Sequence, residues 1–92
     1  MKRNTFILGF LLCGVNVLHA QSPQQVFEQA NQLYQQEKFT EARQAYESLV
    51  RNGYVSGELY YNLGNACYKS GDIARAILHY ERALKLIPSD ED

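Results

Sequence analysis

What this sequence lacks excludes several classes of protein. The 92-residue chain has two cysteines, Cys13 and Cys67, and Cys13 lies in a segment that we expect to be removed. A single remaining thiol cannot form an internal disulfide. No block of Lys and Arg provides the cationic surface that nucleic acid binding needs. No Cys–His pair has the spacing of metal ligands and no glycine-rich loop follows a strand, so we expect neither a metal nor a cofactor.

Catalytic groups are also missing. His79 is the only histidine after residue 20, and we expect it on the outer surface of a helix beside Glu81 and Arg82. No serine is followed by a base partner. Acidic residues lie among Gln, Lys and Arg on faces that we expect to be exposed (Glu28, Glu37, Glu41 and Glu47). We therefore do not expect an enzyme.

Residues 1–20 have the pattern of a cleaved secretory signal peptide. Two basic residues precede an apolar run from Phe6 to Leu18, and the small residue Ala20 marks the expected cleavage site. The run has roughly 13 residues, against about 20 needed to cross a bilayer, so a retained membrane anchor is the less favoured alternative. We expect an exported protein of the periplasm or cell envelope, whose small acidic surplus mainly serves solubility.

The chain repeats itself with a period of 34 residues. After a short linker (21–22), residues 23–56 align without a gap on residues 57–90. The pairs include Ala30 with Gly64, Asn31 with Asn65, Tyr34 with Tyr68, Phe39 with Ile73, Ala42 with Ala76, Tyr46 with Tyr80 and Glu47 with Glu81. A fixed period of this length is typical of stacked repeat proteins, which usually bind other chains.

Each repeat is predicted to form two helices. Apolar residues recur at helical spacing over 23–36, 39–51, 57–70 and 73–87, and no segment alternates with a period of two. Ser22 with Gln25 fits a capping box, and Asp72 is placed to cap the last helix. Gly53 and Gly71 mark helix ends. The fold class is therefore all-α, with two tandem antiparallel helical hairpins.

Buried positions follow from the same spacing. In the third helix, Leu59, Leu63, Ala66 and Cys67 point inward. In the fourth, the predicted buried stripe is Ala76, Ile77, Tyr80, Ala83 and Leu84, although Ile77 and Leu84 should stay partly bare without a third repeat. We expect Cys67 to be a buried small side chain, with an intermolecular disulfide or reactive thiol as the alternative. Gly64 predicts a close contact with a neighbouring backbone.

The second repeat resembles a tetratricopeptide repeat (TPR), which implies a TPR-type α-solenoid. The matching residues between positions 60 and 88 are Tyr60, Leu63, Gly64, Tyr68, Gly71, Ala76, Tyr80, Ala83 and Pro88. The first repeat departs from the pattern, with Leu49 for the usual small residue and Tyr54 where proline is expected.

The signal followed by these repeats is also similar to the BatE proteins of the bacterial aerotolerance operon. That resemblance implies an envelope complex with von Willebrand-type and AAA+ partners. Proteins of that group continue beyond the equivalent of Asp92, so we expect this chain to be an N-terminal fragment.

The predicted partner-binding groove lies on the inner face formed by the first helix of each hairpin. Its residues are Phe27, Asn31, Gln35, Glu58, Tyr61, Asn62, Asn65 and Lys69. Their amides would bind an extended peptide backbone, and their rings would give apolar contacts. Some TPR proteins hold a C-terminal carboxylate at positions matching Asn31 and Asn62, but Phe27 replaces the expected lysine. Alternatively, these residues only solvate an exposed face or pack on a missing third repeat.

Two functions remain open. The first is an exported scaffold that binds a protein or peptide segment on the inner face of its helices. The second is a structural element that self-associates through its exposed helical end.

Overall fold

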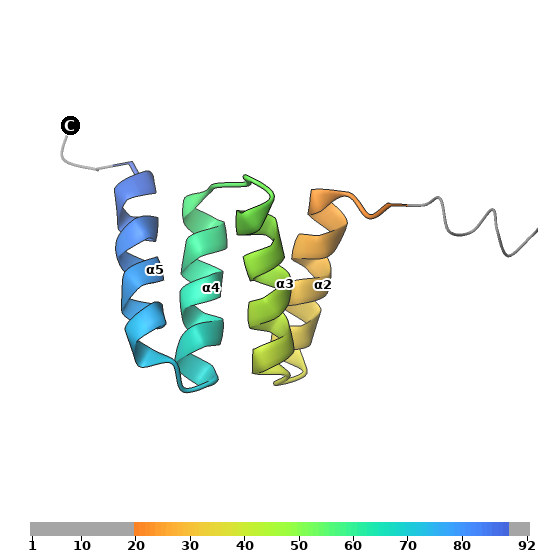
Figure 1. Ribbon diagram of the computed structural model, residues 1–92, viewed down its shortest axis with the longest axis horizontal. Helices are drawn as coiled ribbons and strands as arrows, with labels where there is room; N and C mark the ends of the chain where they lie inside the picture. Colours follow the sequence, from red (N-terminus) through yellow and green to blue (C-terminus); the bar gives the residue numbers. More distant parts are fainter. Residues whose placement is uncertain (1–19, 89–92) are drawn as a thin grey trace, which may run out of the picture.

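The computed structural model describes residues 20–88, which form helices that each run antiparallel to the next. Their bounds are Pro23–Gln35 (α2), Phe39–Arg51 (α3), Gly57–Lys69 (α4) and Ile73–Leu86 (α5). Figure 1 shows α5, α4 and α3 side by side, with α2 behind α3. Since the described part contains no strand, the predicted all-α fold of tandem hairpins is confirmed. The signal peptide predicted over 1–20 falls, except for Ala20, outside the described residues, as do residues 89–92.

The predicted helix starts are confirmed by their caps. Gln25 N donates to Ser22 Oγ at 3.1 Å, and Ser22 N donates to Gln25 Oε1 at 2.9 Å. At the start of α5, Arg75 N donates to Asp72 Oδ1 at 3.1 Å. These caps satisfy backbone N–H groups that have no partner inside the helix.

The two hairpin turns use the same backbone conformation with different residues. Gly71, between α4 and α5, has φ 93°, which glycine adopts at little cost. Glu37 occupies the equivalent position between α2 and α3 and has φ 63°, a value that a residue with a side chain adopts only under strain. The first hairpin therefore stores strain that the second does not.

The core runs along the contacts between consecutive helices. Ala30, Ala42, Leu63, Ala66 and Cys67 are fully or almost fully buried, which confirms the prediction for Cys67. Burial raises the pKa of its thiol, so the nucleophilic thiolate form is disfavoured.

The predicted close contact at Gly64 is present, but the group that contacts Gly64 is not backbone. A Cβ atom at Gly64 would lie 2.7 Å from ring carbons of Tyr80, so the close neighbour is an aromatic side chain rather than backbone. The small residue makes room for a tyrosine from α5.

The predicted surface position of His79 and the predicted buried stripe of α5 are both wrong. His79 is only 7% exposed, and its ring stacks on Tyr60 with centroids 5.8 Å apart, so it is not a surface residue. The buried face of α5 is formed by Ala76, His79 and Ala83, which are three and four residues apart and therefore lie on one side of the helix.

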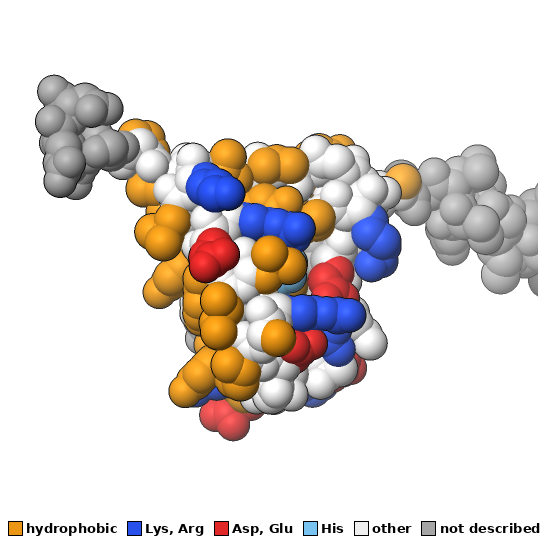
Figure 2. Space-filling model, turned by 60° about the vertical axis from the view of Figure 1, so that its left-hand side comes forward, with side chains coloured by type: hydrophobic (Ala, Val, Ile, Leu, Met, Phe, Trp, Pro, Cys, Tyr) orange, Lys and Arg blue, Asp and Glu red, His pale blue; other side chains and the backbone are white. Residues whose placement is uncertain are grey.

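Ile77 and Leu84 do not belong to this buried face. They are 54% and 70% exposed, because no described helix packs on their side of α5. Their exposure confirms that the outer edge of the last helix stays bare. Figure 2 shows hydrophobic side chains gathered along one edge of the molecule, at the left of the view.

Candidate functional site

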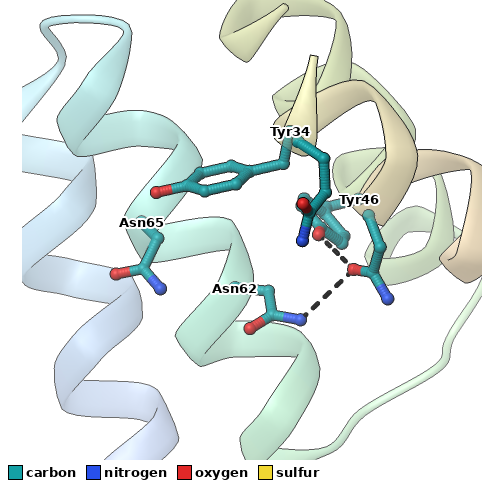
Figure 3. Close-up of a pocket in the computed structure, with 6 residues that line it drawn as sticks. Tyr34, Tyr46, Asn62 and Asn65 are labelled. Atoms are coloured by element: carbon teal, nitrogen blue, oxygen red, sulfur yellow. Dashed lines mark hydrogen bonds between the residues drawn. The ribbon is translucent and has the colours of Figure 1, made fainter. Parts of the chain in front are cut away.

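A pocket of about 240 Å³ lies between α2 and α4, on the side where the first helices of the two hairpins face each other. Tyr46 of α3 also lines it. The pocket is lined by Asn31, Tyr34, Gln35, Tyr46, Asn62 and Asn65. In Figure 3 the Tyr34 side chain extends from α2 toward α4, where Asn62 and Asn65 project from neighbouring turns. We call this the amide pocket.

Hydrogen bonds hold the amides of this pocket in place. The Tyr46 hydroxyl donates to Asn31 Oδ1, and Asn62 Nδ2 donates to the same oxygen at 3.4 Å. One repeat later, the Tyr80 hydroxyl donates to Asn65 Oδ1 at 2.5 Å. The same tyrosine–asparagine pair thus recurs at the 34-residue period and ties the two helices of each hairpin together.

The tyrosine hydroxyls remain protonated donors under ordinary conditions. Burial raises the pKa of Tyr46 to about 12, and burial also raises the pKa of Tyr80. A protonated hydroxyl fixes the asparagine oxygen as acceptor, so the Asn65 amide nitrogen must point elsewhere. Within the described part of the chain neither Asn65 Nδ2 nor Asn62 Oδ1 has a hydrogen-bond partner. One donor and one acceptor are thus available to a ligand.

The structure brings together half of the predicted groove residues. Asn31, Gln35, Asn62 and Asn65 line the amide pocket. The other four, Phe27, Glu58, Tyr61 and Lys69, do not.

These four have other surroundings. Phe27 packs edge-on against the Tyr46 ring at 5.8 Å, and Tyr61 lies 5.8 Å from the ring of Tyr80. Lys69 Nζ lies 5.8 Å above the ring of Phe39. Glu58 is exposed in the first turn of α4. Phe27 is therefore a packing residue, and the other three are exposed outside the pocket.

Sequence reasoning missed Tyr34 and Tyr46 as pocket residues. The available signal was their recurrence as Tyr68 and Tyr80, since a tyrosine kept at both equivalent positions suggests use of the hydroxyl as well as the ring.

The side chains that line the amide pocket can donate and accept hydrogen bonds. Its lining consists of amides and phenols, without a carboxylate, an imidazole or a thiol. Among residues 20–88 no group of His, Cys, Asp and Glu is arranged to hold a metal ion. None of the described helices combines the length and the apolar character that a membrane span requires.

The comparison with protein families matches residues 27–91 to the tetratricopeptide repeat family. The chain belongs to the tetratricopeptide repeat family. TPR domains generally mediate protein–protein interaction and are typically scaffolds rather than enzymes. No curated protein and no solved structure matches the chain significantly.

Proposed function

We propose that this TPR protein is an exported scaffold that binds an extended segment of a partner protein in the amide pocket. The observation that carries the proposal is the pair of amide atoms Asn62 Oδ1 and Asn65 Nδ2, on adjacent turns of α4, which accept or donate no hydrogen bond within the described part of the chain. A peptide backbone offers alternating N–H donors and C=O acceptors, so it can satisfy both atoms at once.

The pocket favours a backbone over a terminal carboxylate. No Lys or Arg lines it, and Phe27, at the position where a carboxylate-binding TPR has lysine, packs on Tyr46 instead. A carboxylate without a cationic partner would lose hydration without compensation. The ring of Tyr34 offers an apolar contact to a side chain of the bound segment.

The cellular location and the complex that we propose are supported by the signal-like residues 1–20 and by the BatE-like order of signal and repeats. We place the protein in the periplasm or cell envelope, in a BatE-like complex with von Willebrand-type and AAA+ partners. Fractionation of cells that express a tagged chain tests the location: recovery with the cytoplasm, with residues 1–20 intact, would contradict it.

Photo-crosslinking tests the binding site. A crosslinker at Gln35 should capture a partner segment, which a synthetic peptide then reproduces in titrations. Asn62→Ala should weaken binding by about 0.5–1.5 kcal/mol, the contribution of one hydrogen bond. Gln29→Ala is the control for Asn62→Ala. It also removes an amide side chain, but Gln29 is exposed on α2 and does not line the pocket. Equal effects of the two substitutions would show that the amide pocket is not the binding site.

A second candidate function is self-association through the bare edge of α5, formed by Ile73, Ile77 and Leu84. The occupant that fits is the same edge of a second copy. Head-to-tail stacking is disfavoured because the outer side of α2 presents Gln25, Gln29 and Gln32. Mass measured against concentration should then show a dimer that Ile77→Glu abolishes. A monomer at all concentrations would eliminate this function and leave the scaffold proposal intact.

A further inference from the structure

A second pocket, of about 390 Å³, is lined by residues of α3, α4 and α5. Leu63 of α4 forms its floor, and Val50 and Leu78 are its apolar walls. Around these walls lie Arg51 of α3 and Arg75 and Arg82 of α5. We call it the arginine pocket. It shares no residue with the amide pocket.

The charge of the arginine pocket is concentrated and incompletely neutralised. Residues 20–88 contain as many Lys and Arg as Asp and Glu, yet three arginines and one carboxylate, Glu47, line this pocket. Glu47 pairs with Arg75 at 3.6 Å and also with Arg43 at 3.3 Å, outside the lining. Arg51 and Arg82 form no ion pair with a described residue. Two guanidinium groups are thus available to an anion.

A buried polar atom marks the same place. His79 lines the pocket and is 93% buried, and its Nδ1 atom has no hydrogen-bond partner in the described part of the chain. Buried polar atoms are rarely left without a partner, so one that is calls for an explanation. Arg82 lies 5.7 Å from the ring of Tyr60, the ring on which His79 stacks, so the guanidinium and the imidazole share one neighbour.

We propose that the arginine pocket binds an acidic peptide segment, with a carboxylate between Arg51 and Arg82 and an adjacent apolar side chain on Val50 and Leu78. Arginine binds carboxylates through two parallel hydrogen bonds, and these bonds strengthen where water is partly excluded. The apolar walls favour a carboxylate carried by a peptide over a small inorganic anion, which would keep its hydration shell. Glu47 already shows a carboxylate paired with Arg75 at this pocket.

Peptide titration of the 92-residue chain tests the proposal. The probe is a blocked Leu-Glu-Leu-Glu-Leu peptide, and its control replaces each Glu by Gln. The acidic peptide should bind, and Arg51→Gln and Arg82→Gln should each weaken binding about tenfold or more, as expected for hydrogen bonds to a charged group. Lys85→Gln is the matched control, because Lys85 lies on α5 but does not line the pocket. Equal binding of the Gln peptide, or an equal loss with Lys85→Gln, would overturn the proposal.

His79 provides a second, spectroscopic readout. Burial and the nearby Arg82 hold the pKa of its imidazole below 6.5, with Arg75 acting in the same direction and Glu47 and Asp72 opposing it. A bound carboxylate should offset the arginines and raise this pKa, which NMR titration of the His79 ring measures. An unchanged pKa with bound peptide would place the peptide elsewhere. Asn62→Ala should leave both readouts unchanged, so failure here and failure of the amide-pocket proposal are distinguishable.

Discussion

Among residues 20–88, a further helix covers the far side of the second helix of the first repeat, whereas no helix covers the far side of the second helix of the second repeat. α3 packs closely against both α2 and α4, whereas α5 packs closely against α4 and reaches α3 through the ion pair of Arg75 with Glu47. Val50 of α3 is half-buried, and its equivalent in α5, Leu84, is 70% exposed. The same position in the same motif is interior in one repeat and surface in the other. Burial in a repeat protein is therefore decided by the next helix along the stack.

The opposite end of the stack differs in residue type. Leu63 and Ala66 of α4 are fully buried, and their equivalents in α2 are Gln29 and Gln32, which are exposed. The exposed face of α2 is thus polar, whereas the exposed outer edge of α5 is apolar. We therefore expect equivalent substitutions in the two repeats to differ most in their effect on stability at these positions.

Leu63→Ala should lower the free energy of unfolding by about 2–5 kcal/mol, because it removes a fully buried side chain and leaves a cavity. Gln29→Ala, the equivalent substitution in the first repeat, should stay within about 0.5 kcal/mol. Urea unfolding followed by circular dichroism measures both. Similar values would mean that the two helices are equally covered in solution.

Gly64→Ala should destabilise the second hairpin by about 1–3 kcal/mol, because the added methyl group meets the Tyr80 ring. Helix propensity alone predicts the opposite sign, a gain of up to about 1 kcal/mol. Gly57→Ala is the control on the same helix, where the new Cβ lies 3.1 Å from the flexible Ile87 side chain. Thermal melts that show both variants equally stable would refute the close contact.

Tyr34→Ala should cost about 1–2 kcal/mol, whereas Tyr68→Ala should cost less than about 0.5 kcal/mol. Tyr34 packs on the Phe39 ring at 5.0 Å and is half-buried, while Tyr68 is 57% exposed. Chemical denaturation of both variants makes the comparison. A larger loss from Tyr68→Ala would show that a partner, such as a second copy, covers Tyr68 in solution.

Glu37→Gly should raise the free energy of unfolding by up to about 1 kcal/mol, because glycine relieves the left-handed backbone of the first turn. Gly71→Ala should lower it by about the same amount at the equivalent turn. Denaturant midpoints of the two variants should therefore move in opposite directions, and movement in the same direction would contradict the shared turn geometry.

His79 should make the free energy of unfolding depend on pH. The first repeat has no equivalent group, because Ala45 occupies the matching position. Because burial and Arg82 lower the pKa of His79 below 6.5, the unfolded chain binds its proton more readily than the folded one. Its stabilising effect is present above pH 6.5 and is lost as the pH falls through the folded pKa. Unfolding measured between neutral and mildly acidic pH should show this loss, and His79→Gln should remove it.

The helices and their caps could be predicted because they depend on residues close together in the chain. Ser22 with Gln25, and Asp72 with the start of α5, lie within one helical turn, and apolar spacing defines the helices between them. The 34-residue period also indicated the stacking of hairpins. The family match over residues 27–91 agrees with that prediction.

The candidate site could be predicted only in part. Asn31, Asn62 and Asn65 were recognised from their shared helix faces, but their bonds to tyrosines of other helices depend on how the hairpins close. His79 was misplaced because its polarity suggested the surface, whereas packing of α5 on α4 buries position 79 and leaves the more apolar Ile77 outside. Polarity predicts exposure on average, but helix phase decides it for a given residue.

The sequence by itself determined the helix bounds, the repeat and the family, since these follow from local capping, from 3.6-residue periodicity and from self-similarity along the chain. Only the tertiary structure decided which amide atoms stay free, which arginines lack a carboxylate and which apolar edge is bare. These properties depend on groups far apart in the chain, such as Asn65 with Tyr80 and Arg51 with Arg82. They arise only when helix packing sets their distances, and they carry both proposed binding sites.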